Sequence, residues 1–177
     1  SVISFNYHDA HINLIDTPGY ADFIGETIAG ASAADTAMIV IDAAAGVEVG
    51  TETGWRLASK RNMPRLIVMN RLDRENAQWQ NALESIQEHF GSQCQPLQLP
   101  IGEESSFKGI VDVLSGNAFQ ADGASKSDMP SEMNEVVATT RENIIERIAE
   151  ADDELMLKYL EGEELTQASF LVESEGL

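Results

Sequence analysis

The sequence predicts an α/β domain with a mostly parallel sheet, followed by a small α+β subdomain. Apolar, β-branched runs alternate with helix-periodic segments over residues 1–101, which is typical of strand–helix–strand units. After Gly102 this alternation is lost and the chain becomes more acidic. We therefore predict two parts, a domain over residues 1–101 and an acidic subdomain over residues 102–177.

The first part contains five extended segments. Val2–Tyr7 and Ile12–Ile15 are short, β-branched and separated by a tight turn, which favours a hairpin. Ala37–Ile41 and Arg65–Met69 are continuous apolar runs, as expected for strands buried on both faces. Residues 95–101 are the last extended segment in this strand–helix alternation.

Three helices are predicted between these strands. Residues 21–34 are rich in alanine and form the first helix. The second runs from Thr51, whose hydroxyl can cap it, to about Asn62. The third is indicated by the helical spacing of Trp79, Leu83, Ile86 and Phe90.

The second part begins with two short strands, at residues 107–113 and 117–121. The remaining predicted segments are a loop at 122–131 and helices at Glu132–Ala149, Asp152–Leu160 and after Thr166.

The charge balance constrains the partners. The 177 residues hold 30 acids and 11 Lys and Arg residues, a formal net charge of −19. Such a surface disfavours direct, sequence-specific binding to nucleic acid and favours a basic protein partner. The acids are concentrated in residues 101–177, with 18 acids and 5 bases, against 12 and 6 before them.

The cysteine count and the first residue of the sequence indicate where the protein is located and whether the sequence is a piece of a longer protein. A single cysteine, Cys94, excludes an internal disulfide and is typical of the reducing cytoplasm. We find no run long enough for a membrane span and no secretory signal. The chain starts at Ser1 without a methionine, which favours a piece of a longer protein.

Three apolar strands end in a polar residue, Asp16, Asp42 or Asn70. In open parallel sheets the carboxyl ends of the strands are where ligands bind. Asp and Asn are also ordinary turn residues, so each one alone is weak evidence of a site.

The first candidate motif is Asp16-Thr17-Pro18-Gly19. A carboxylate at a strand end can hold Mg²⁺ through water, because this ion keeps much of its hydration shell. Gly19 lets the backbone approach a phosphate and donate its N–H, while Pro18 stiffens the turn.

The second candidate motif is Asn70-Arg71-Leu72-Asp73. The carboxylate of Asp73 can accept two N–H bonds from the edge of a guanine. Asn70 can bond the other side of the base or tie neighbouring loops, and the stem of Arg71 can lie over the ring.

With both motifs on successive strand ends, the chain resembles the GTPase domain of translation factors, most closely elongation factor G and elongation factor G-like proteins. DTPGYADF is similar to the family's DTPGHVDF, and NRLDRENA to its NKMDR segment. LQLPIGEESSFKGIVDVL and LMLKYLEGEE resemble the two ends of the family's insertion subdomain, so the likeness covers about Ile3 to Glu164. The resemblance implies a P-loop-NTPase-type fold, GTP or GDP with Mg²⁺, and a ribosomal role in the cytoplasm.

One family motif has no counterpart in this chain. The phosphate loop, G-x-x-x-x-G-K-S/T, is absent, and the nearest string, Gly25–Ser32, has alanine for lysine inside a predicted helix. By resemblance, the loop and the first strand precede this region. That strand would lie between the strands at 11–15 and 37–41, so we expect these two to pair directly or to exchange with a second molecule. We expect the chain alone to be inactive.

Two residues depart from the family motifs. Arg71 replaces a lysine, which should leave base recognition intact. Tyr20 replaces the histidine that positions the attacking water in the family. A phenol has no ring nitrogens and is uncharged at pH 7, so the resemblance implies weak or altered GTP hydrolysis.

Two alternatives remain open. In one, the chain is a non-catalytic module whose acidic helices bind a basic protein of the ribosomal stalk. In the other, Asp16 and Asp42 serve a Mg²⁺-dependent hydrolase, although Asp42 alone is more typical of a turn residue.

Overall fold

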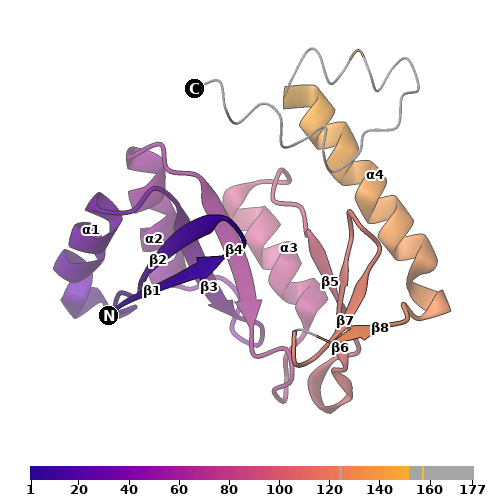
Figure 1. Ribbon diagram of the computed structural model, residues 1–177. Helices are drawn as coiled ribbons and strands as arrows, with labels where there is room; N and C mark the ends of the chain where they lie inside the picture. The colour runs from indigo at the N-terminus through magenta and orange to yellow at the C-terminus, as the bar shows by residue number, and fades with distance from the viewer. Residues whose placement is uncertain (124, 152–156, 158–177) are drawn as a thin grey trace.

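The computed structural model describes residues 1–123, 125–151 and 157. In chain order, the strands are β1 (Val2–Tyr7), β2 (Ala10–Ile15), β3 (Ala37–Asp42), β4 (Arg65–Asn70), β5 (Gln98–Ile101), β6 (Gly109–Asp112), β7 (Ala118–Gln120) and β8 (Lys126–Ser127). The α-helices are α1 (Ile24–Ser32), α2 (Val49–Lys60), α3 (Trp79–Phe90) and α4 (Asn134–Ala151), and the 3-10 helices are η1 (Ala21–Phe23), η2 (Glu104–Ser106) and η3 (Ser131–Met133). Figure 1 shows this order along the chain.

The predicted α/β class is confirmed by the central parallel pair, β3 and β4. Ile39 and Ile41 of β3 are buried against Ile86 and Phe90 of α3, and Trp55 of α2 stacks on Phe90 at 4.2 Å between ring centroids. Helices α2 and α3 therefore cover one face of this sheet. On the other face, Met38 and Val40 are 54% and 57% exposed.

A second core lies under helix α4. Strands β5, β6, β7 and β8 form an antiparallel sheet in that order. Val111 and Val113 are fully buried there, together with Leu99 and with Val137 and Ile144 of α4. The helix closes one face of the sheet and completes the small α+β subdomain (Figure 1).

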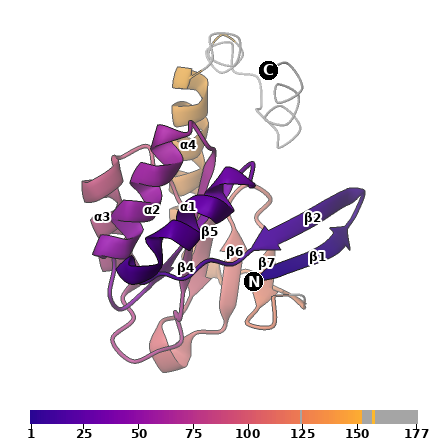
Figure 2. The same ribbon diagram turned by 90° about the vertical axis from the view of Figure 1, so that its left-hand side faces the viewer.

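The hairpin β1–β2 stands apart from both cores, as Figure 2 shows. Its strands pair in register from Val2↔Ile15 to Tyr7↔Ala10. Because side chains alternate between faces, Ile3, Phe5 and Tyr7 share one face with Leu14. These four side chains are 40–63% exposed, so the hairpin carries an uncovered apolar face.

One alternative for β2 and one expectation for β5 were wrong. In the described part of the chain β2 pairs with β1 and not directly with β3, so the hairpin and the β3–β4 pair are separate sheets, and exchange with a second molecule stays a prediction. Strand β5 does not extend the parallel sheet but pairs antiparallel with β6. The expected boundary at residue 101 stays a prediction. The ladder between β5 and β6 crosses it.

Smaller differences concern helix starts and short elements. Helix α2 begins before Thr51, which lies in its first turn and accepts the Glu48 N–H at 3.2 Å, so Thr51 is not the cap residue. The predicted loop at 122–131 contains β8, which is too short to show a sequence pattern. The helices predicted at Asp152–Leu160 and after Thr166 lie outside the described residues.

None of the helices in the described part of the chain is both long and apolar enough to cross a membrane.

Candidate functional site

The carboxyl ends of β3 and β4 bring Asp42 and Asn70 side by side as the last pair of the parallel ladder. The Ala43 N–H donates to the Asn70 carbonyl at 3.0 Å and extends the ladder by one bond. Two of the three polar strand ends predicted from the sequence therefore meet at one edge of the sheet.

Arg71 leaves this edge in a left-handed conformation, with φ +64°. Such a φ is uncommon for a residue with a side chain. Its N–H donates to Asn70 Oδ1 at 2.8 Å, which stabilises the turn. Its guanidinium returns across the edge and donates to Asp42 Oδ2 at 2.8 Å.

Asp42 thus forms an ion pair with Arg71 and is also a turn residue. Its other oxygen, Oδ1, accepts the Ala44 N–H at 2.9 Å. The hydrogen bond from Arg71, followed by that from Ala44, lowers the pKa of the Asp42 carboxyl below its ordinary value. Because Arg71 compensates the charge of Asp42, this carboxylate is poorly suited to hold a metal ion, which weakens the alternative of a hydrolase built on Asp16 and Asp42.

The loop after Arg71 presents Asp73 to solvent. Within the described residues, the Asp73 carboxylate has no hydrogen-bond or ion-pair partner. The loop is held from the second subdomain by Glu104, whose N–H donates to the Leu72 carbonyl at 3.0 Å. The Glu104 carboxylate in turn accepts the Asn76 N–H at 2.8 Å. Our sequence reasoning missed Glu104, because it looks like an ordinary surface acid in an acidic run.

The segment Asp16–Gly19 follows β2 in the chain. In space it contacts α1 on one side and the start of α2 on the other. Thr27 of α1 donates to the Pro18 carbonyl at 3.1 Å, which fixes the turn. Gly30 of α1 packs so closely on Thr17 that an added Cβ would come within 2.6 Å of its methyl group. The Gly19 carbonyl would similarly lie 3.2 Å from a Cβ on Gly50 of α2.

Asp16 and Gly19 keep groups available for a ligand. Asp16 is exposed, and among the described residues its Oδ2 accepts only the Ser1 hydroxyl, at 3.3 Å. In the described part of the chain the Gly19 N–H donates to no acceptor. Tyr20 follows with 78% of its surface exposed, so its phenol does not pack on the turn.

The two motifs form separate groups. Among the described residues, no hydrogen bond or ion pair joins Asp16–Tyr20 to Asn70–Asp73. The described residues also contain no group of three or more His, Cys, Asp or Glu side chains placed to hold a metal ion.

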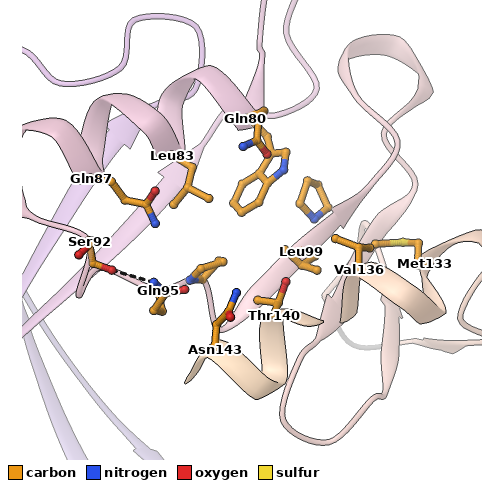
Figure 3. A pocket seen from close by; sticks show the side chains of 13 residues that line it. Gln80, Leu83, Gln87, Ser92, Gln95, Leu99, Met133, Val136, Thr140 and Asn143 are labelled. Carbon is orange, nitrogen blue, oxygen red and sulfur yellow. Dashed lines mark hydrogen bonds between the residues drawn. The ribbon is translucent and has the colours of Figure 1, made fainter. Parts of the chain in front are cut away.

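Two cavities of the described structure lie elsewhere. The larger, of about 510 Å³, opens between α3, β5 and α4 and is lined by carboxamides and apolar groups, with Leu83 and Gln87 facing Thr140 and Asn143 (Figure 3). The smaller, of about 270 Å³, lies behind Ala43–Gly46 and the first turns of α3. Neither is lined by Asp16–Tyr20 or Asn70–Asp73.

Comparisons with known proteins identify the family of the chain. Residues 1–171 match the family model described as the elongation factor Tu GTP binding domain. The chain is 38% identical over 170 residues to elongation factor G of Mycoplasma pneumoniae, covering 93% of this chain and 25% of that protein. It is 37% identical over 166 residues to the elongation factor G-like protein of Thermotoga maritima, covering 93% and 24%.

A solved structure shows the same fold. A crystal structure of a protein from Thermus thermophilus matches with a TM-score of 0.86 and 35% identity, covering 95% of this chain and 26% of that one. The chain thus spans about a quarter of the length of the relatives it matches. The resemblance to elongation factor G and its fold is confirmed, and the chain belongs to the family of elongation factor GTP-binding domains.

Proposed function

We propose that this chain provides the switch and base-recognition motifs of a GTP-binding elongation factor of the elongation factor G type, which acts on the ribosome in the cytoplasm. The observation that carries the proposal is the pair of motifs at the carboxyl ends of β2 and β4 in a chain of this family. The carboxyl end of β4 lies at the edge of the parallel pair, and such edges are where nucleotides bind in open α/β sheets.

On the base side, Asp73 accepts two N–H bonds from the guanine edge. Its exposed and unpaired carboxylate is compatible with that role. Asn70 holds the backbone of Arg71 through its Oδ1. Because the Arg71 head is tied to Asp42, its aliphatic stem is the part that lies over the base.

On the phosphate side, the Gly19 N–H, which has no acceptor among the described residues, donates to a phosphate oxygen, and the bond from Thr27 to the Pro18 carbonyl fixes the turn that presents it. The exposed Asp16 carboxylate has the chemistry to hold a hydrated Mg²⁺ ion. When bound, Mg²⁺ supplies positive charge beside the phosphates. The 177 residues contain no phosphate loop, so tight binding requires phosphate contacts from outside this chain.

The base site is tested by Asp73→Asn in the full-length protein that contains this chain. The amide presents one acceptor and one donor group where guanine offers two donors, so GDP affinity should fall by about 1–3 kcal/mol, or about 5- to 150-fold. Isothermal titration calorimetry measures the change. Asp35→Asn, at an exposed residue outside both motifs, is the control. Equal GDP affinity in Asp73→Asn and the unmodified protein would contradict the base role, and the 177-residue chain alone should bind GDP far more weakly.

Hydrolysis is tested at Tyr20. The exposed phenol lacks the ring nitrogens that would position a water, so we propose slow or altered hydrolysis in the full-length protein. Tyr20→His should raise the hydrolysis rate by about 10-fold or more at saturating GTP, since a positioned general base contributes roughly 10²- to 10⁴-fold. Single-turnover hydrolysis in the presence of ribosomes measures this rate. Tyr20→Phe is the control, and loss of hydrolysis in that variant would show instead that the phenol takes part.

We also propose that the acidic subdomain binds a basic protein of the ribosomal stalk. Glu135 and Glu142 lie exposed on α4, where a positively charged surface could approach. The double variant Glu135→Gln/Glu142→Gln should bind purified stalk protein several-fold more weakly in a pull-down at low salt. Glu26→Gln/Glu88→Gln removes the same charge from α1 and α3 and should bind normally. Equal loss in both pairs would mean that only net charge matters.

The proposal that the chain forms a strand-exchanged oligomer rests on its uncovered surfaces. The hairpin exposes one apolar face, and in the described part of the chain β2 and β3 each have one edge without a paired strand. We expect the 177-residue chain to be dimeric by size-exclusion chromatography with light scattering. Phe5→Lys, on the apolar face, should give a monomer, whereas Ser4→Lys, on the opposite face, should leave the dimer. A clean monomer of the unmodified chain would exclude exchange.

A further inference from the structure

Glu104 connects the second subdomain to the loop that carries Asp73. It begins η2, a few residues after β5, and lies far from Asp73 in the sequence. Its backbone N–H donates to the Leu72 carbonyl at 3.0 Å, and its Oε1 accepts the Asn76 N–H at 2.8 Å. One residue thus binds the backbone on both sides of Asp73.

The backbone of Glu104 is itself held in an unusual conformation. Its φ is +48°, in the left-handed region that residues with a side chain seldom adopt. The turn around it is tight, because Ser106 N–H donates to the Glu103 carbonyl at 2.9 Å and the Glu103 N–H donates to the Ser106 hydroxyl at 3.0 Å. A costly conformation of this kind persists only where the surrounding contacts require it.

We propose that Glu104 is a positioning residue for guanine recognition, holding the loop so that the Asp73 carboxylate faces the base. The inference rests on the proposed function, in which Asp73 binds guanine. It adds that the affinity of this site depends on a residue of the acidic subdomain. Glu104 touches no reacting atom and acts only through the loop.

If Glu104 only stabilised the fold, its loss would lower the melting temperature; if it positions the loop, its loss should lower nucleotide affinity instead. Glycine relieves the strain of a left-handed backbone but removes the carboxylate that accepts the Asn76 N–H. Glu104→Gly should therefore keep or raise the melting temperature of the protein while weakening its binding to guanine nucleotides. Glu104→Gln keeps an oxygen acceptor of the same length and should retain both properties.

The test uses the full-length protein that contains this chain, with GDP as the probe. We expect Glu104→Gly to lower GDP affinity about 10-fold, the size expected for losing one hydrogen bond to a charged acceptor. Glu104→Gln should stay within about 3-fold, since a neutral acceptor is somewhat weaker. Glu103→Gln is the control at the neighbouring acid. Scanning calorimetry on the same samples gives the melting temperatures.

The outcomes separate this inference from the base site itself. If Asp73→Asn loses affinity and Glu104→Gly does not, the positioning role is overturned and the base site stands. If neither variant loses affinity, both proposals fail. If Glu104→Gly and Glu104→Gln lose GDP affinity equally, the positioning role is also overturned, because the acceptor oxygen would then be irrelevant. If Glu104→Gly does not fold, Glu104→Asn replaces it, since Asn tolerates the left-handed region and is one methylene too short to reach Asn76.

Discussion

The parallel pairing of β3 and β4 is the constraint on which the proposed base-recognition edge depends. It places Asp42 and Asn70 opposite one another, because parallel strands in register end at the same edge. The chain must then turn away sharply, and Arg71 does so with a left-handed backbone that Asn70 stabilises. The guanidinium of Arg71 compensates the charge of Asp42, so two polar strand ends and one turn form a single network.

The same network gives a physical account of the arginine at position 71. A guanidinium offers several donors in a planar fork and stays charged at all relevant pH values. At this edge one of those donors is used by Asp42, whose pKa is lowered by that bond, and the pair remains partly in contact with water. Such a pair adds little to stability, about 1 kcal/mol or less, so its main effect is to orient the Arg71 side chain.

Much of this arrangement could be predicted from the sequence, since Asp16, Asp42 and Asn70 each follow an apolar run whose end is visible in the pattern. The pairing of the strands could not be predicted. Hydrophobic periodicity identifies a strand such as β5 but does not specify its neighbour, which proved to be β6. The contact of Glu104 with Asn76 was also hidden, because a polar contact between loops distant in sequence leaves no periodic signal.

Glu104 joins the two parts of the chain through two hydrogen bonds to the loop that carries Asp73. Glu104 follows β5, and β5 is hydrogen-bonded into the sheet that packs under α4. Its side chain accepts a hydrogen bond from the loop that extends from β4. If a partner bound to α4 displaced this sheet, the displacement would reach the Asp73 loop through two hydrogen bonds. Linkage is reciprocal, so a guanine nucleotide that orders this loop would favour the partner-bound arrangement by the same free energy. Guanine recognition and partner binding would then be coupled through one glutamate.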